Sequence, residues 1–560
     1  MKNGQPLALA VALVIGLWFG RGCGWGSGDE STPAVAFHRH WNASGDQARL
    51  LNILQRVEDL YVDTFNRSRL VDAAIDAMLE ELDPHTVYFS GEELASMSEN
   101  MEGNFEGIGV EFIIQDDTLM VVTAIPGGPS EASGIQAGDR ILLVDGEAIS
   151  GPALDNRRVM DLLKGPRGTQ VTLGLARRGQ EFQAHLTRDR IPIQSVVAAF
   201  NMEDNVGYIK AIRFAAKTAQ EFEAAMAFLE EQGATSVVVD LRGNGGGYLN
   251  AVVDMVELFL EEGEPIVYTE GKSSPRRTYS TRRKGPYAQW PIAVIVDEGS
   301  ASASEIFAGA IQDNDRGIVV GRRTFGKGLV QEEFPVPGSG ALRLTVARFY
   351  TPTGRAIQKP YSEYEDDFDV RLQSGELYHA DSMPLVDSLR YVTPLGREVF
   401  GGGGIAPDVF VPWDSAATSS WVSEWIWTGV LRDAVFTWMD GRREALTMCD
   451  NANAIESLSN WDAEVVEAVY AEADRGGWPW REPSEEEAAK LRHRFLAQVV
   501  RALWGESASY EVLNQGDEGV ARAVHALLDE QAFFRAGGTV SLGLTNHENI
   551  IHSNNQEHGF

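Results

Sequence analysis

Two spacings of apolar residues alternate along this chain, and the change from one to the other divides it into regions. Between residues 36 and 100 apolar side chains recur every three or four positions: Leu50, Leu51, Leu54, Val57, Leu60, Leu70, Ala74 and Leu79. This spacing puts them on one face of a helix, so residues 36–100 are predicted to form an N-terminal helical region. Pro84 stops the last of these helices, because proline cannot continue an α-helix.

From about residue 190 the pattern changes to short apolar runs that alternate with helical segments. Four runs are predicted as strands: Gly207–Phe214, Ser236–Asp240, Pro265–Thr269 and Ile292–Val296. The first helix between them is expected to open with a capping box formed by Thr218 and Glu221. Strands that alternate with helices indicate a mainly parallel sheet, so residues 189–413 are predicted to form an α/β core. An acidic, turn-rich insert interrupts this core at residues 359–395.

The C-terminal part of the chain returns to a helical pattern. Residues 414–536 are rich in tryptophan and are predicted to form a C-terminal helical domain. The polar residues 537–560 that follow are expected to be a disordered tail.

The first 24 residues contain an apolar centre, Leu7–Phe19. This centre is shorter than the ~20 apolar residues that a membrane span needs, and it suits the apolar region of a secretory signal. The chain is therefore expected to be exported, to the periplasm or the cell envelope. Residues 1–24 are either a cleaved signal or a retained N-terminal membrane anchor, and both alternatives stay open.

Composition narrows the class of protein. A formal net charge of −33 argues against a nucleic-acid partner, because binding phosphates needs a basic surface. Hydrophobic residues make up 44% of the chain, which is enough for ordinary cores. The two cysteines, Cys23 and Cys449, exclude both a disulfide framework and a cysteine metal site. Any chemistry must come from other side chains.

Those side chains gather between Glu298 and Gln331. Three serines, Ser300, Ser302 and Ser304, open an apolar helix directly after the strand-like run Ile292–Val296. No histidine lies between His185 and His379, so a nucleophilic serine here has no local imidazole to activate it. A lysine kept neutral by burial could serve as the base instead.

A structural role for Ser302 competes with this catalytic interpretation. Ser302 and Glu305 have the spacing of a capping box, which stabilises a helix by about 1 kcal/mol without any catalysis. Two features favour catalysis: a helix N-terminus attracts developing negative charge, and a second glycine turn, Gly243–Gly247, follows the end of another strand. In α/β sheets, sites lie at the carboxyl ends of strands.

Two motifs in this region carry a family resemblance. The chain has S-A-S-A-S-E at residues 300–305 and T-F-G-K-G-L-V-Q at residues 324–331, and it resembles the C-terminal processing (tail-specific) protease family of serine–lysine endopeptidases. The resemblance implies that Ser302 is the nucleophile, Lys327 its general base and Gln331 the residue that orients the lysine. It also implies an oxyanion hole from the backbone N–H groups of Gly247 and Ala303, and a twisted α/β core of the crotonase-like kind.

A second resemblance covers residues 103–188, which look like a PDZ domain inserted into the core or preceding it. The run F-E-G-I-G-V at residues 105–110 supplies a glycine-rich loop that leads into a strand. Backbone N–H groups of Gly107, Ile108, Gly109 and Val110 are expected to bind a chain-terminal carboxylate, while the peptide adds as a strand to the sheet edge. His85, just upstream, is predicted to cap a turn and not to act as a catalytic base.

The resulting functional prediction is an exported serine endopeptidase. It would bind C-terminal tails of protein substrates through its PDZ domain and cleave them through an acyl-enzyme on a Ser–Lys dyad. The resemblance implies no metal and no organic cofactor. The alternative is a catalytically silent PDZ and core scaffold that binds peptides in the cell envelope. Peptide substrates are the expected partners, with membrane attachment by the N-terminal segment and homo-oligomer formation both left open.

Overall fold

The structure is a computed structural model that describes residues 45–115, 117–151, 154–336, 340–364, 366–414, 425–458, 460–479, 481–529, 533–536 and 539–542. The chain forms two compact units, Met1–Ile75 and Asp76–Phe560. The predicted signal or anchor, residues 1–24, lies outside the described residues, and so does most of the predicted tail. Among the described residues, no helix is both long enough and apolar enough to cross a membrane.

Two helices occupy the range in which the helical spacing predicted them, α2 (Gly45–Leu60) and α3 (Arg67–Glu80). The apolar stripe of α2 is exposed, with Leu51 63% and Leu60 74% accessible. A third helix, α4 (Gly91–Glu102), opens with a capping box of Ser90 and Glu93 and ends at Gly103, whose φ of 73° suits a helix C-terminus.

The predicted α/β core contains a six-stranded sheet. Its strands, in spatial order, are β10 (Val196–Asn201), β11 (Val206–Ala211), β12 (Ser236–Asp240), β15 (Ile292–Val296), β16 (Ile318–Gly321) and β21 (Val409–Phe410). All neighbours are parallel except β10 and β11. The prediction of a mainly parallel sheet is confirmed, and β12 and β15 have the predicted bounds.

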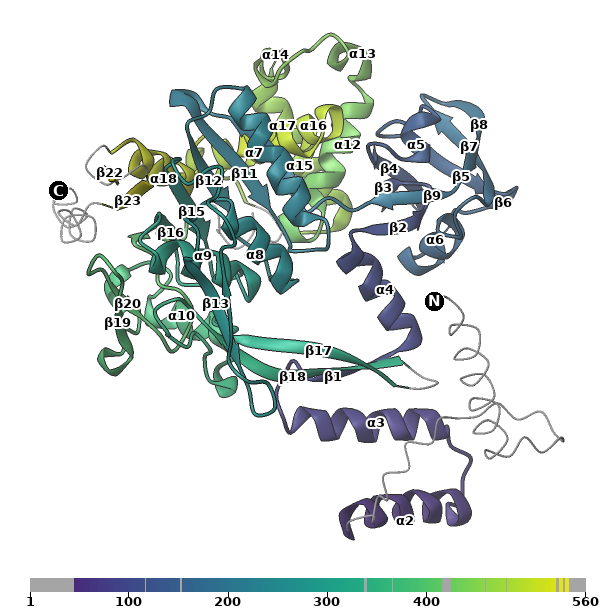
Figure 1. The fold of residues 1–560 in the computed structure, drawn as a ribbon. Coiled ribbons are helices and arrows are strands. Elements are labelled where there is room, and N and C mark those ends of the chain that lie inside the picture. Colours follow the sequence, from purple (N-terminus) through teal and green to yellow (C-terminus); the bar gives the residue numbers. More distant parts are fainter. Residues whose placement is uncertain are drawn as a thin grey trace, which may run out of the picture. The chain divides into compact units, whose positions relative to one another are not determined.

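Side chains that alternate along these strands pack on two different layers. Side chains on one face pack against α7 (Thr218–Glu231), α8 (Leu249–Glu257) and α9 (Ala303–Asp313). Val294 of the sheet and Phe307 of α9, for example, belong to the same core cluster. The other face meets α18 (Glu518–Leu528), where Ile295 shares a cluster with Val520. Figure 1 shows the sheet between these helices. The last helix of the predicted C-terminal domain therefore completes the α/β core.

The predicted capping box at the start of α7 is wrong. The Glu221 carboxylate accepts hydrogen bonds from the backbone N–H groups of Ser195 (2.7 Å) and Val196 (3.0 Å), and not from the helix N-terminus. The Thr218 hydroxyl accepts instead from the N–H of Ala215 at 2.7 Å. The N–H groups of Ser195 and Val196, where β10 begins, lie close to Glu221, so a tertiary contact replaces the local one.

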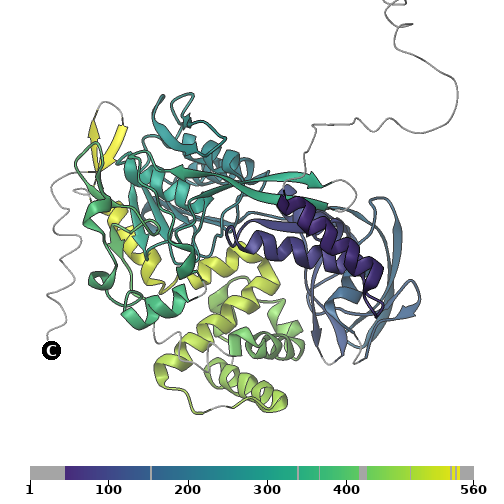
Figure 2. The same cartoon turned by 90° about the horizontal axis from the view of Figure 1, so that it is seen from below.

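A second sheet joins the region before residue 100 to the core. It contains β1 (Val87–Ser90), β18 (Gly340–Tyr350), β13 (Pro265–Glu270) and β14 (Arg277–Ser280), with β17 (Leu329–Val336) also paired to β18. Strands β17 and β18 form a long hairpin that extends away from the core (Figures 1 and 2). Since β1 precedes the PDZ region and β18 follows it, the PDZ region is inserted into the core.

The PDZ region forms a sheet of its own, and two paired strands connect it to the rest of the chain. Strands β2 (Asn104–Gly107) and β9 (Asp189–Pro192) pair at its entrance and exit. The sheet contains β3 (Val110–Gln115), β4 (Thr118–Ala124), β5 (Arg140–Val144), β7 (Gln170–Arg177) and β8 (Gln180–Thr187), with β6 (Glu147–Ala148) on β5. Two helices accompany it, α5 (Pro129–Ala132) and α6 (Asn156–Leu163).

Among the described residues before α18, six further helices with complete bounds form a cluster of their own. They are α12 (Val430–Asp440), α13 (Arg443–Leu446), α14 (Ala452–Glu456), α15 (Trp461–Gly476), α16 (Glu485–Trp504) and α17 (Glu506–Leu513). Phe436 on α12 packs against Ile113 and Met120 of the PDZ sheet, and Arg140 pairs with Asp440 at 2.9 Å. The helical domain thus contacts the PDZ domain.

The remaining elements lie in the predicted insert and in the predicted tail. The insert contains α10 (Asp367–Ser374), the 3-10 turns η2 (Tyr361–Glu363), η3 (Ala380–Ser382) and η4 (Asp387–Leu389), and the strands β19 (Arg390–Val392) and β20 (Glu398–Phe400), which reach just beyond it. Strands β22 (Phe533–Ala536) and β23 (Thr539–Leu542) form a hairpin, and β23 falls within the range predicted as a tail.

Candidate active site

Ser302 lies where β15 leads into α9, at the position predicted for a nucleophile. Its backbone has φ 55° and ψ −109°, which residues with a side chain seldom adopt. Such a conformation costs about 1–3 kcal/mol and persists only where surrounding contacts enforce it. Ser302 also directly precedes the first turn of α9, whose N-terminus stabilises negative charge on nearby oxygens.

The contacts that hold Ser302 in this backbone conformation come from the glycine turn that follows β12. The Asn244 carbonyl accepts from the N–H of Ala301 at 3.0 Å and from the hydroxyl of Ser304 at 2.7 Å. Gly246 has a φ of 102°, and a Cβ there would come within 2.7 Å of the Ser302 Cβ. Only glycine fits at residue 246, because any side chain would displace the serine.

The three serines of the motif have different surroundings. The Ser300 hydroxyl donates to the carbonyl of Leu241 at 2.8 Å, and the Ser304 hydroxyl is taken by Asn244. Ser300 and Ser304 are completely buried, whereas Ser302 is only half-buried. The geometry therefore favours Ser302 over its neighbours as the residue that can meet a substrate.

Glu305 connects the serine to the lysine. Its buried carboxylate accepts from the N–H groups of Ser302 (2.8 Å), Gly326 (2.7 Å) and Lys327 (2.8 Å), and from the Thr324 hydroxyl (2.6 Å). Ser302 and Lys327 share one oxygen, Oε2, so their backbones are held beside each other. Burial raises the pKa of Glu305, while the donated hydrogen bonds lower it. The sequence identified Glu305 only as a capping residue.

Lys327 lies in an irregular loop between β16 and β17, and its side chain is half-buried. Burial lowers the pKa of Lys327, and the charge of Arg343 lowers it further, while Glu305 and Asp83 act in the opposite direction. A lysine with a lowered pKa is neutral at a lower pH than an exposed one, as a general base requires.

Gln331 and His85 meet beside this lysine. The Gln331 amide donates to the backbone carbonyl of His85 at 2.7 Å. Burial, followed by the charge of Lys327, lowers the pKa of His85 to about 4, so the imidazole is neutral at neutral pH. Its Nε2 lies 3.2 Å from the Tyr364 hydroxyl. The prediction that His85 caps the turn is wrong, because Asp83 does so by accepting the His85 N–H at 2.9 Å.

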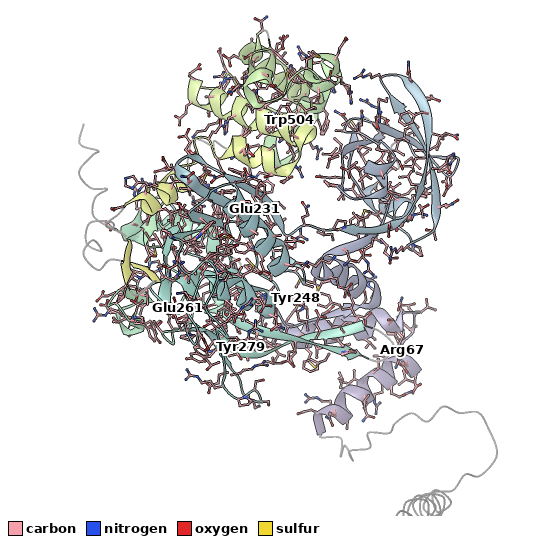
Figure 3. The ribbon with its side chains drawn as sticks, turned by 45° about the horizontal axis from the view of Figure 1, so that its top comes forward. Arg67, Glu231, Tyr248, Glu261, Tyr279 and Trp504 are labelled. Atoms are coloured by element: carbon pink, nitrogen blue, oxygen red, sulfur yellow. The ribbon has the colours of Figure 1, made fainter. Side chains whose placement is uncertain are left out.

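The two predicted oxyanion donors lie on adjacent segments. The Phe214 N–H donates to the carbonyl of Gly246, and the Tyr248 N–H donates to the carbonyl of Phe214, so the Gly247 N–H takes no part in these two bonds. Figure 3 labels the side chain of Tyr248, the residue that follows Gly247. Ala303 is the first residue of α9, where an N–H has no acceptor within the helix. Its nitrogen is 3.0 Å from where a Cβ on Gly246 would lie, so the glycine turn and the helix N-terminus touch.

A buried cluster of ion pairs holds Arg242, the residue directly before the glycine turn. Asp240 pairs with Lys210 (3.0 Å) and with Arg242 (2.6 Å), and Lys210 also donates to the Arg242 carbonyl at 2.6 Å. Burial alone would raise the pKa of Asp240, but the two cations hold it well below its usual range. Arg242 further pairs with Asp517, the N-cap of α18, at 2.8 Å.

The predicted carboxylate-binding loop turns its carbonyls inward. The Ile108 carbonyl accepts from the N–H and the hydroxyl of Ser130 (3.0 and 2.7 Å), and the Gly109 carbonyl accepts from Ile125 (2.9 Å). In a trans peptide the following N–H points the opposite way, so the N–H groups of Gly109 and Val110 face away from these partners. Gly107 ends β2, and Val110 begins β3, the edge strand of the sheet.

The insert was predicted only as an acidic, turn-rich segment, yet it lies against the lysine loop. Arg371 on α10 is 1% exposed and donates to backbone carbonyls of that loop, and the ring of Tyr364 packs on His85 and Phe325. No local pattern signals these contacts, because an arginine in a polar helix is usually a surface residue. In the described part of the chain, no group of three or more His, Cys, Asp or Glu side chains is arranged to bind a metal.

Two family models match the chain. Residues 205–370, which include Ser302, Lys327 and Gln331, match Peptidase family S41, and residues 120–177 match the PDZ domain. Both matches fall within the ranges predicted for the core and the PDZ domain.

Individual relatives agree with these models. The chain is 34% identical over 362 residues to a carboxy-terminal-processing protease of Bartonella bacilliformis, covering 61% of this chain and 82% of the relative. It is 32% identical to the carboxy-terminal processing protease CtpB of Bacillus subtilis, covering 59% of this chain and 69% of the relative. Among solved structures, a photosystem II D1 C-terminal processing protease matches 56% of this chain and 90% of its own, with 30% identity and a TM-score of 0.32.

Proposed function

The chain belongs to the carboxy-terminal processing serine proteases of Peptidase family S41, and we propose that it is an exported member that cleaves protein tails with Ser302 and Lys327. The observation that carries this assignment is the Glu305 oxygen that accepts from the N–H groups of both residues, because it holds the two segments together. A catalytically silent scaffold would need neither the strained Ser302 backbone nor a lysine of lowered pKa.

In the first half of the reaction, neutral Lys327 takes the hydroxyl proton of Ser302 while Oγ attacks the carbonyl carbon of the substrate peptide bond. The resulting oxyanion is stabilised by the N–H groups of Gly247 and Ala303, each donor contributing about 3–4 kcal/mol. The C–N bond then breaks, and the lysine ammonium gives its proton to the leaving amine. The N-terminal part of the substrate remains as an ester on Ser302.

In the second half, water attacks that ester and passes a proton to neutral Lys327. The ester C–O bond breaks, and the proton moves from the lysine to the Ser302 oxygen. This step releases a new C-terminal carboxylate and restores the free enzyme. Gln331 contributes by holding the backbone of His85 beside the lysine.

The PDZ domain delivers the tail in this proposal. The N–H groups of Gly107, Ile108, Gly109 and Val110 bind the terminal carboxylate, and the peptide adds along the edge of β3. The support is that β3 pairs on one side only with β4, and that the loop carbonyls are already taken by Ser130 and Ile125.

Export is supported by the sequence alone. The apolar centre Leu7–Phe19 has the length of a signal region, and we assign the protein to the periplasm or cell envelope, either released or anchored by residues 1–24. Cell fractionation of the full chain, with N-terminal sequencing of the mature protein, tests this assignment. Recovery from the cytosol with an intact Met1 would overturn it.

The catalytic proposal is tested with purified protein and an unfolded protein substrate that has a free C-terminus. Mass spectrometry should show truncation near that end, and a folded Ser302→Ala variant should give none. Equal truncation by that variant contradicts the assignment. A substrate with an amidated C-terminus should be cut several-fold more slowly, because the amide lacks the charge that the loop binds. Equal rates for acid and amide would remove the carboxylate-binding role while leaving the dyad intact.

A further inference from the structure

The loop that carries Lys327 has no regular secondary structure from residue 323 to residue 328. Its backbone N–H groups are nonetheless bound, by Glu305 at Gly326 and Lys327, by the Ser300 carbonyl at Phe325 (3.0 Å), and by Gln358 at Gly328 (2.8 Å). An irregular segment holds its position only through such contacts, so whatever binds its carbonyls also places the lysine.

Arg371 binds three of those carbonyls in a row. One guanidinium nitrogen donates to the carbonyl of Arg323 at 2.7 Å, and another donates to those of Thr324 at 3.0 Å and Phe325 at 3.4 Å. The planar, five-donor shape of arginine permits several bonds from one side chain, which lysine cannot reproduce. The fourth carbonyl, that of Gly326, accepts from the Lys359 N–H at 3.0 Å.

The insert also holds Arg371 itself. Asp367, one turn earlier on α10, pairs with Arg371 at 3.0 Å and with Lys359 at 2.9 Å. Glu376 lies 3.8 Å from Arg371 and pairs with Arg323 of the loop at 2.6 Å. A buried cation is stable only when paired and hydrogen-bonded, and Arg371 satisfies both conditions here.

We propose that Arg371 is a positioning residue for catalysis: from the insert, it fixes the main chain directly before Lys327 and so sets the place of the base relative to Ser302. The two ends of the same loop are then bound by opposite charges, its N–H groups by the Glu305 carboxylate and its carbonyls by the Arg371 guanidinium. Arg371 follows directly after residue 370, where the match to the peptidase family model ends. The inference rests on the proposed roles of Ser302 and Lys327.

The test compares three variants in the full chain. Arg371→Gln removes the cation while Asp367 keeps Lys359 as a partner, and Arg371→Lys keeps the charge but can bind only part of the carbonyl row. Arg390→Gln is the matched control, because Arg390 lies in the same insert, pairs with Glu398 at 2.7 Å and is half exposed. Each variant is assayed for kcat and KM on a peptide substrate, for the rate of Ser302 labelling by a fluorophosphonate, and for thermal unfolding.

Arg371→Gln should lower kcat by about 100-fold, as expected for a base displaced by roughly 1 Å, with KM within about twofold of wild type. Ser302 labelling should slow by the same factor, because it needs the base but no peptide binding. For Arg371→Lys, kcat and the labelling rate should lie between those of Arg371→Gln and wild type. For Arg390→Gln, both should equal those of wild type. A purely structural arginine would change the unfolding temperature and leave both rates per folded molecule unaltered.

A folded Arg371→Gln protein with wild-type kcat, or with a change in KM alone, overturns the inference. If that variant does not fold, Arg371→Lys and Glu376→Gln decide the matter, and wild-type kcat in both overturns it. Ser302→Ala and Lys327→Ala are assayed in parallel. If either of these retains activity, the proposed dyad fails, whereas inactivity of both together with normal Arg371 variants rejects only the positioning role.

Discussion

The proposed nucleophile and the proposed base lie on two segments, the serine segment and the lysine loop, that are held in place by different kinds of contact. The serine segment, residues 300–305, is bound mainly by its own motif and by the glycine turn, through Ser300, Ser304 and Asn244. The lysine loop is bound on one side by Glu305 and on the other by Arg371 of the insert. A short motif therefore holds the proposed nucleophile, whereas the proposed base is held by contacts with a distant part of the chain.

The largest effects are expected from replacing the proposed nucleophile or the proposed base, and they show whether catalysis needs both. Ser302→Ala removes the nucleophile, and Lys327→Arg replaces the base with a group that stays protonated in proteins. Each change should lower kcat by roughly 10⁴-fold or more, with the unfolding temperature nearly unchanged. The double variant should be no worse than either single one, because the two residues act as a unit. Measurable turnover by Lys327→Arg at any pH would remove lysine from the role of base.

Glu305→Gln is the next largest change, because it disturbs both segments at once. The carboxylate accepts two donors on each oxygen, so the NH2 group of a glutamine would face one of these two pairs of donors in place of an acceptor. We expect kcat to fall by about 100-fold through displacement of the dyad. Glu93→Gln is the matched control, since Glu93 accepts from Ser90 in an exposed capping box away from the site. Equal effects from the two substitutions would reduce Glu305 to a helix cap.

The pH dependence of kcat/KM tests the lysine loop separately from the serine segment. The base must be neutral, so kcat/KM should rise with pH through the pKa of Lys327, about tenfold per unit on the acid limb. Burial places that pKa below the usual value of 10.5, helped by Arg343 and opposed by Glu305 and Asp83. His85 also faces this lysine and is already neutral above about pH 4. Replacing Arg343 with Met should shift the limb to higher pH, and an unshifted limb would assign it to another group.

The smallest effects are expected from the two outer serines. Ser304→Ala leaves the Asn244 carbonyl with one donor fewer, and Ser300→Ala does the same for the carbonyl of Leu241. Each should lower the free energy of unfolding by about 1–3 kcal/mol while kcat changes by less than about tenfold. Urea unfolding together with kcat measurements checks this. A complete loss of activity in a folded Ser304→Ala protein would move the nucleophile to that residue.

Much of the fold followed from short-range pattern. The strands Ser236–Asp240 and Ile292–Val296 were predicted residue for residue. A strand buried on both faces is a nearly continuous apolar run, and polar residues mark where the run stops. The local prediction failed at Glu221, whose carboxylate binds the N–H groups of Ser195 and Val196 at the start of β10. It also placed α18 in a separate domain, although Val520 packs on the core sheet. In both cases the deciding partner lies far away in the sequence.

The sequence by itself determined the family and the two motifs that carry the proposed nucleophile and the proposed base, since these depend on residue types at fixed local spacing. Only the tertiary structure decided the strained backbone of Ser302, the four bonds of Glu305 and the contact of Arg371 with the lysine loop. The physical reason is that an irregular loop has no hydrogen-bonding pattern of its own. Its groups must be satisfied by whatever the fold brings near, and spacing along the chain carries no record of that.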